Sequence, residues 1–309
     1  YRLATTPVVV RDDMAVRMVQ PMILAHADWT ALDPDAIIRS LISQSESRLT
    51  PEDRGLAKVT HLIWPESVFP FFLTNQPEAL ARIARMLPDT TLLLTGAPRE
   101  ALGDDGLPIP DNPGYNAILA IDGAGEVVAS YDKAHLVPFG EYLPLQNVFR
   151  LFGINQLVPG TNGWAPGNGR RLMSPPMSPE FLALVCYEAV FPGDIGDPDG
   201  AQFILNVTND AWFDGSIGPA QHAHHARMRA VETGLPMLRA ANTGVSFATD
   251  PLGRITGQLA EEQIAVLDTI PHRPLEGGTM FNRIGNAPSL VAGLVMLVGA
   301  ALARRRRPA

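Results

Sequence analysis

The sequence predicts an α/β protein of layered β-sheets and covering helices, closed at its C-terminus by a transmembrane helix. Two observations predict the α/β part: short apolar runs alternate with helical patterns, and turn residues bound each run. A final uncharged, apolar segment predicts the transmembrane helix. With 309 residues, 46% of them hydrophobic, the chain can bury a large core, which excludes a disordered or low-complexity protein.

The strand candidates are runs rich in Val, Ile and Leu, bounded by Gly, Pro, Asp or Asn. They cover residues 16–24, 59–64, 91–96, 116–121, 126–131, 180–186, 202–207, 236–241, 245–248 and 263–269. Between the fourth and fifth of these, residues 122–125 (DGAG) predict a hairpin loop.

Three segments have helical patterns. They cover residues 35–45, 77–86 and 219–233. Asp33 predicts a capped start for the first helix, with Pro34 at its first helical position, and Pro219 has the same role in the third.

Two long loops interrupt this alternation. Residues 97–113 are rich in Pro, Gly and Asp, and residues 159–179 are rich in Pro, Gly and Ser. Neither is long enough to link independent domains, so we predict that both are excursions from one domain, where long loops often form lids or binding loops. Residues 144–159 between them are apolar in a loop-like context, which fits either a buried segment or an arm that touches lipid.

The end of the chain has the pattern of a membrane anchor. Residues 284–303 carry no charge, and four arginines follow them. Twenty helical residues span about 30 Å, the thickness of a bilayer core, and a basic cluster marks the cytoplasmic side. We therefore predict a non-cytoplasmic domain over residues 1–283, a transmembrane helix over 284–303 and a cytoplasmic tail over 304–309. A buried C-terminal helix is the alternative.

Charge and cysteine content narrow the function classes. The net charge is −8, and no acidic residue follows position 283, so the body of the protein is acidic and nucleic acid is not an expected partner. The single cysteine forms no intramolecular disulfide and so does not indicate a redox compartment. No signal peptide is visible after Tyr1, so we expect a membrane segment upstream to deliver the domain.

Three chemically important residues each follow a predicted strand. Cys186 ends an apolar run, where the N–H groups of the next turn can bind an oxyanion formed on a substrate carbonyl. Lys133 lies in a polar run, and a lysine near a thiol lowers the pKa of the thiol and stabilises an oxyanion. Glu66 follows Trp64 and Pro65, and a carboxylate wrapped by them would have a raised pKa and accept a proton from a thiol.

Taken alone, each of these residues has an ordinary structural explanation: a buried cysteine, a solvated lysine and a turn carboxylate. Because all three follow strands, they can meet at one edge of a layered α/β fold. Together they form a complete set for covalent acyl transfer, with Cys186 as the nucleophile, Glu66 as the base and Lys133 as the electrostatic partner.

A histidine cluster lies on the third predicted helix. His222, His224 and His225 do not have the spacing of an HExxH zinc motif, and no second cluster supplies further ligands. We expect these histidines to line the helix surface and predict neither a metal nor a cofactor. Asp–His or Asn–His partners for Cys186 are less well supported than Glu66 and Lys133.

Several longer motifs occur in the order typical of a known family. WPES, YDKAHLVPFGEYLP, VCYE, NDAWFDGSIGPAQHAHHARMRAVE and LRAANTG resemble the carbon–nitrogen hydrolase (nitrilase) superfamily and, within it, the apolipoprotein N-acyltransferase family. The resemblance covers about residues 16–305. It implies a nitrilase-like four-layer α-β-β-α sandwich, which the alternating elements permit. The family's N-terminal bundle of membrane helices has no counterpart in these 309 residues, and we expect it upstream.

The resemblance also implies the residues of the site. It places the catalytic triad at Glu66, Lys133 and Cys186, a supporting glutamate at Glu141, a Tyr-Glu pair at Tyr187 and Glu188, and a loop tryptophan at Trp29.

The implied activity is a membrane-bound N-acyl transfer. A fatty acyl group moves from a phospholipid, through a thioester on Cys186, to the N-terminal amine of a diacylglyceryl-cysteine apolipoprotein. The implied location is the periplasmic face of the bacterial cytoplasmic (inner) membrane. The expected partners are therefore the phospholipid donor, the apolipoprotein acceptor and the bilayer, with the chain acting as a monomer. Because water must not reach the thioester, we expect residues 144–179 to form a covering loop.

Two alternatives use the same residues. A nitrilase-type amidase would share the triad but hydrolyse a small amide, with water as the final acceptor. The C-terminal span and the VPFGEYLP stretch favour the acyltransferase. An inactive, membrane-anchored binding module would use the same pocket for recognition, but the presence of all three triad residues argues against it.

Overall fold

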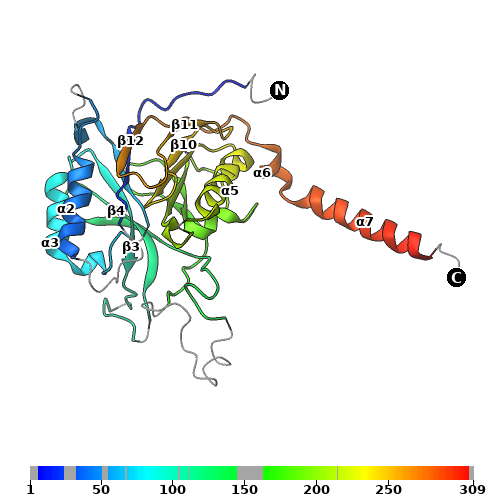
Figure 1. Ribbon diagram of the computed structural model, residues 1–309, viewed down its shortest axis with the longest axis horizontal. Coiled ribbons are helices and arrows are strands. Elements are labelled where there is room, and N and C mark those ends of the chain that lie inside the picture. Colours follow the sequence, from blue (N-terminus) through cyan, green and yellow to red (C-terminus); the bar gives the residue numbers. More distant parts are fainter. Residues whose placement is uncertain are drawn as a thin grey trace.

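Two β-sheets lie face to face at the centre of the protein (Figure 1). The computed structural model describes residues 6–23, 33–50, 55–66, 68–103, 105–110, 112–144, 163–213 and 215–305. The first sheet has the strand order β12 (Ala265–Thr269), β1 (Val16–Gln20), β2 (His61–Trp64), β3 (Leu92–Arg99), β4 (Tyr115–Ile121) and β5 (Val127–Asp132). The second has the order β11 (Ile255–Gln258), β10 (Phe247–Thr249), β9 (Met237–Ala241), β8 (Ile204–Thr208), β7 (Phe181–Val185) and β6 (Leu172–Met173).

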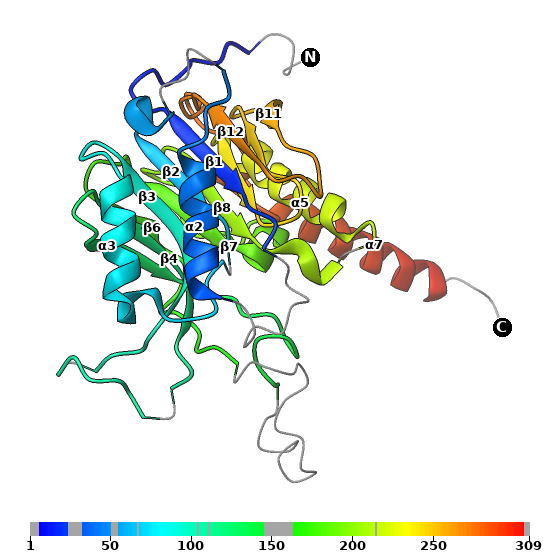
Figure 2. The ribbon, with the colours of Figure 1, turned by 60° about the vertical axis from the view of Figure 1, so that its left-hand side comes forward.

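Helices cover the outer face of each sheet (Figure 2). Helices α2 (Pro34–Ser45) and α3 (Pro77–Met86) pack on the first sheet, and α5 (Gly218–Thr233) packs on the second. Three buried hydrophobic clusters fill the interfaces: one under α2 and α3, one between the two sheets and one under α5. The predicted two-sheet α-β-β-α sandwich is therefore confirmed.

The central strands of each sheet are parallel. β1, β2 and β3 run in one direction in the first sheet, as do β7, β8 and β9 in the second. Their side chains are buried on both faces, which explains why they read as continuous apolar runs rather than alternating ones. The segments that leave the carboxyl ends of such strands gather at one edge, where functional groups concentrate in α/β folds.

Every strand and helix predicted inside the domain is present within a few residues of its expected bounds. The side chain of Asp33 caps α2 by accepting a hydrogen bond from the N–H of Asp35, as predicted. Strands β4 and β5 form the expected hairpin. Two edge strands were not predicted: β6 has two residues, and β11 is largely exposed, so neither has an apolar run.

The C-terminus continues as α6 (Met280–Ile284) and α7 (Ala287–Arg305), and α7 projects away from the sandwich (Figure 1). Within the described ranges, no helix is both long and apolar enough to cross a membrane. The predicted span over residues 284–303 stays a prediction. Residues 145–162, which make up most of the predicted apolar arm and half of the predicted covering loop, lie outside the described residues.

Hydrogen bonds attach this C-terminal unit to the domain. Asn282 donates from Nδ2 to the carbonyl of Thr233 at the end of α5 (2.9 Å). Asn286, just before α7, donates to the carbonyl of Pro192 (3.1 Å). Pro192 follows a short 3-10 helix, η4 (Cys186–Val190), so the base of α7 is attached near the segment that begins at Cys186.

Candidate active site

The three predicted triad residues lie at the ends of strands. Glu66 follows β2, Lys133 follows β5 and Cys186 follows β7. Nζ of Lys133 lies 3.7 Å from Oε1 of Glu66, and both side chains are buried. Both act electrostatically on the thiol of Cys186, which is partly exposed. The fold therefore brings together three groups that are far apart in the sequence.

A buried polar network holds Glu66 and Lys133 in place. Glu141 accepts a hydrogen bond from Nζ of Lys133 (2.8 Å) and another from the N–H of Val137 (2.8 Å). Asn116 donates from Nδ2 to Oε1 of Glu66 (2.7 Å) and to Oε1 of Glu141 (3.1 Å). Two carboxylates thus flank one ammonium, and Asn116, which the sequence did not single out, joins them.

Burial sets the proton affinities of these groups. It raises the pKa of Glu66, against the opposing charge of Lys133. It also raises the pKa of Cys186, as does the carboxylate of Glu66, and these effects outweigh the opposing effect of Lys133. Burial alone would lower the pKa of Lys133, but Glu66 and Glu141 raise it overall. The thiol is therefore protonated at rest and lies near a carboxylate with increased proton affinity, which suits a general base.

One detail of the expected proton affinities, the pKa of the thiol, needs correction. Lys133 does act to lower the pKa of Cys186, but the net shift is upward because burial is the larger effect. The indole of Trp64 packs in the core under α2 and donates to Oγ of Ser45 (2.9 Å). Burial raises the pKa of Glu66, as expected for an enclosed carboxylate.

The backbone at Cys186 is strained. Its φ is 50°, in the left-handed region that a non-glycine residue adopts at a cost of about 1–3 kcal/mol. The chain turns here from β7 directly into η4. Such strain persists only where neighbouring groups fix the conformation, and it is typical of functional sites.

Glu188 is the main clamp on this turn. It is fully buried, and its carboxylate accepts hydrogen bonds from the N–H groups of Val185, Ala134 and His135 and from the hydroxyl of Tyr131. These donors come from the end of β7, from β5 and from the loop that begins at Lys133. Glu188 therefore ties the segment of Cys186 to the segment of Lys133.

Of the two remaining residues predicted for the site, Tyr187 is described by the structure and Trp29 is not. Tyr187 is partly buried, and its ring makes edge contacts with Phe191 (4.8 Å between centroids) and His135 (5.8 Å). Trp29 lies outside the described residues, so its predicted place in the site stays a prediction.

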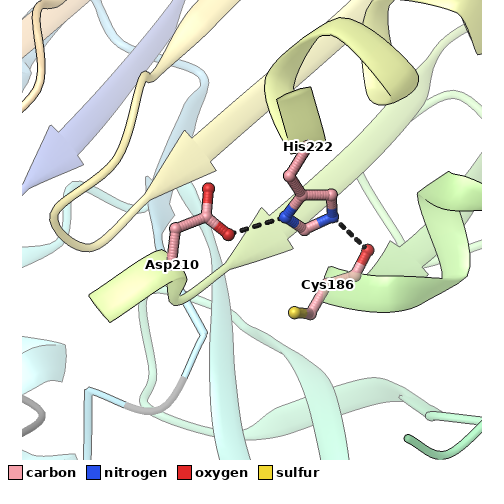
Figure 3. A group of neighbouring side chains, drawn as sticks. All are labelled: Cys186, Asp210 and His222. Atoms are coloured by element: carbon pink, nitrogen blue, oxygen red, sulfur yellow. Dashed lines mark hydrogen bonds and ion pairs between the residues drawn. The ribbon is translucent and has the colours of Figure 1, made fainter. Parts of the chain in front are cut away.

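The prediction for the histidine cluster was wrong for one member. His224 and His225 are exposed on α5, but His222 is buried. Its ring lies between the carboxylate of Asp210, at the start of η5 (Asp210–Phe213), and the carbonyl oxygen of Cys186 (Figure 3). The helical pattern contained a signal, because His222 and Ala226, four residues apart, lie on the same buried face of α5.

Cys186, Asp210 and His222 also have the proximity of metal ligands, with ligand atoms within 4.8 Å of one another. The hydrogen bonds argue against a metal. Both ring nitrogens of His222 have partners, the two carboxylate oxygens of Asp210 accept from Thr208 and Arg239, and the guanidinium of Arg239 would repel a cation. The group fits a hydrogen-bond network better than a metal centre.

The two-sheet fold and the residues at the strand ends define the class of protein. The family profile described as carbon-nitrogen hydrolase matches residues 59–269, a range that includes Glu66, Lys133 and Cys186. The chain therefore belongs to the carbon–nitrogen hydrolase family.

Within that family the similarity is to apolipoprotein N-acyltransferases. The chain is 42% identical over 310 residues to the apolipoprotein N-acyltransferase of Rhodopseudomonas palustris, covering 99% of this chain and 57% of that protein. It is 39% identical over 309 residues to the one of Bradyrhizobium diazoefficiens, covering 100% of this chain and 56% of that protein. The chain thus spans a little over half the length of these relatives.

A solved structure supports the fold independently. A mutant of a Nesterenkonia amidase from the nitrilase superfamily superposes with a TM-score of 0.58 at 19% identity, covering 88% of this chain and 94% of that one. At this identity the match shows the shared fold alone.

Proposed function

We propose that this chain is the catalytic part of a membrane-bound N-acyltransferase. It moves a fatty acyl group from a phospholipid, through a thioester on Cys186, to the N-terminal amine of a diacylglyceryl-cysteine apolipoprotein. The observation that carries the proposal is the buried charge network at Glu66 and Lys133 acting on the thiol of Cys186, in a chain similar over its whole length to proteins named for this activity.

In the first half-reaction, Glu66 takes the thiol proton and the sulfur of Cys186 attacks the ester carbonyl of the phospholipid. Lys133 and the N–H of Tyr187 stabilise the tetrahedral oxyanion. The C–O bond then breaks, and Glu66 returns the proton to the departing lysophospholipid oxygen. The raised pKa of Glu66 supports the first transfer, because a base with increased proton affinity accepts the thiol proton more readily.

In the second half-reaction, the amine of the acceptor attacks the thioester. Glu66 accepts the amine proton as the amide forms, and the thiolate leaves and is reprotonated. Glu141 and Asn116 support both steps by holding Lys133 and Glu66 at fixed positions. Glu188 supports them by holding the turn at Cys186.

We extend the proposal to the membrane. Residues 284–303 hold the chain to the bilayer, residues 1–283 face the periplasm and the arginine tail faces the cytoplasm. In support, large apolar side chains of α7 are half-exposed or more: Leu290, Val291, Leu294, Val295, Met296, Leu297, Val298 and Leu302. Both substrates contain lipid, so an enzyme held at the bilayer meets them directly. The chain should stay with membranes under alkaline carbonate extraction, and a protease added to spheroplasts should digest residues 1–283; release by carbonate contradicts the anchoring.

Acylation of the protein tests the proposed chemistry. The chain is incubated with phosphatidylethanolamine carrying deuterated acyl chains, and intact-mass spectrometry is used to look for a labelled, hydroxylamine-sensitive adduct. We expect the adduct on the wild type, its absence in Cys186→Ser, and its loss when a diacylglyceryl-cysteine peptide is added. A labelled adduct that persists in Cys186→Ser removes the proposed role of the thiol.

The alternative is a nitrilase-type amidase that hydrolyses a small amide, since the fold and the site residues are compatible with water as the acceptor. The two differ in their dependence on lipid. Efficient hydrolysis of small amides without lipid or detergent, together with no adduct from phospholipid, would favour the amidase.

A further inference from the structure

A buried chain of polar groups connects β9 to the peptide bond that follows Cys186. Arg239 on β9 donates to Oδ2 of Asp210. Oδ1 of Asp210 lies 2.6 Å from Nδ1 of His222, and Nε2 of His222 lies 3.0 Å from the carbonyl oxygen of Cys186. Figure 3 shows the ring between the carboxylate and the carbonyl, with the sulfur of Cys186 within 4.8 Å of both side chains. His222 thus hydrogen-bonds to the main chain of Cys186.

The partners of His222 fix the direction in which its ring donates. A carbonyl oxygen only accepts, so the contact with the carbonyl of Cys186 needs the proton of the ring on Nε2. The charged groups around the ring are Asp210, Arg239 and, on its own helix, His225, with Asp210 in the closest contact. The contact with Asp210 at Nδ1 holds the ring so that Nε2 donates to the main chain.

The geometry of the peptide bond extends this effect to the next residue. A trans peptide unit is planar, so the carbonyl of Cys186 and the N–H of Tyr187 point in opposite directions from one rigid plane. A carbonyl held toward His222 therefore aims the N–H of Tyr187 away from the ring. A donor on the carbonyl also polarises the peptide, which strengthens the N–H as a donor.

We propose that His222 is a positioning residue that aims and strengthens the N–H of Tyr187 for the oxyanion formed on Cys186. The inference rests on the proposed acyl transfer at Cys186. It assigns to Asp210 and Arg239 the task of holding the ring in its orientation. It also explains how the strained backbone at Cys186 is held from the side of α5, while Glu188 holds it from the other side.

Two reactions of the same thiol separate this role from a merely structural one. Acylation of Cys186 by p-nitrophenyl butyrate passes through an oxyanion, whereas alkylation by iodoacetamide does not. In His222→Leu, we expect acylation to slow by about 10- to 100-fold, as for the loss of an oxyanion donor. Alkylation should stay within about threefold of the wild type, because it depends on the thiol alone. Equal losses in both reactions, or unchanged acylation, overturn the proposal.

Two further variants sharpen the test. His222→Gln keeps an N–H that can donate to the carbonyl of Cys186, so part of the acylation rate should return relative to His222→Leu. His224→Gln is the matched control, because His224 is exposed on the same helix, and it should react at the wild-type rate. No recovery in His222→Gln, or an equal loss in His224→Gln, contradicts the role of the carbonyl contact.

The two proposals can fail separately, because p-nitrophenyl butyrate is not a lipid. A failure of the phospholipid to acylate Cys186 would count against the proposed function, whereas the reaction rates of the His222 variants would still test the positioning role of His222.

Discussion

Substitution of Glu188 by glutamine tests the clamp on the turn at Cys186. In the wild type, Oε1 accepts from the N–H groups of Ala134 (2.9 Å) and His135 (3.0 Å), and Oε2 accepts from the N–H of Val185 (2.9 Å). Glutamine keeps one accepting oxygen, which the two adjacent N–H groups retain. Its NH₂ group then faces the N–H of Val185, donor against donor.

The loss in the free energy of unfolding that Glu188→Gln causes follows from these contacts. A hydrogen bond to a charged group contributes about 1.5–3 kcal/mol, and a buried N–H left without a partner costs about 1–3 kcal/mol. Glu188→Gln should therefore lower the free energy of unfolding by about 3–5 kcal/mol. Tyr131→Phe removes one hydroxyl donor and keeps the three main-chain contacts, so it should cost only about 1–2 kcal/mol.

Urea unfolding of the detergent-solubilised chain, followed by the fluorescence of its four tryptophans, measures these differences. Glu180→Gln is the matched control, because Glu180 is exposed and accepts from Ser174 at the surface, and its change should stay within about 0.5 kcal/mol. If Glu188→Gln unfolds within 1 kcal/mol of the wild type, or no more easily than Tyr131→Phe, the clamp does not act as described.

Three further predictions concern pH and packing. Burial lowers the pKa of His61 to about 4, below the value of 6.5 in the unfolded chain. The free energy of unfolding should therefore fall by about 3 kcal/mol as the pH drops from about 6.5 to 4. Urea unfolding of His61→Phe should show no such loss. The pKa of Asp210 in the folded protein is about 2, because the guanidinium of Arg239 lowers it against the effect of burial. The ionised carboxylate therefore stabilises the folded state fully above pH 3.8, and this stabilisation is lost as the pH falls through 2. The difference in the free energy of unfolding between the wild type and Asp210→Asn should shrink by about 2 kcal/mol between pH 5 and pH 2. A Cβ at Gly96 would lie 2.5 Å from Cα of Glu66, so Gly96→Ala should displace Glu66 and slow acylation of Cys186 at least about tenfold, whereas Gly293→Ala meets no atom within 4 Å and should react like the wild type. Equal acylation rates in the two glycine variants would contradict the last of these.

The order of the elements could be read from the sequence because it depends on local patterns. Apolar runs with turn residues at both ends predicted the central strands, and the spacing of apolar residues predicted α2 and α3. The contact between Glu66 and Lys133, and their electrostatic action on Cys186, agree with the expectation that strand ends gather at one edge of α/β sheets. The edge strands could not be found because neither β6 nor β11 has a buried run.

The polar residues that support the site were not predictable for a different reason. Arg239 lies inside a strand and is fully buried, which is possible only because Asp210 and Asn206 accept from its guanidinium. Those partners are 29 and 33 residues away, so no local pattern links them. Asn116 is a similar case, because its two carboxylate partners come from different loops.

His222 lies between these cases. We expected it at the helix surface, although its spacing from Ala226 on the buried face of α5 was a signal for burial. Its contact with the carbonyl of Cys186 depends on how α5 packs against the turn after β7, which only the three-dimensional structure shows.

The attachment of Asn286 to Pro192 has a mechanical consequence. Four residues separate the end of Cys186's strand from Val190, and the carbonyl of Pro192 lies two residues further on. The start of α7 is therefore connected to the nucleophile through only a few residues of backbone, so a displacement of α7 has a short path to the turn at Cys186.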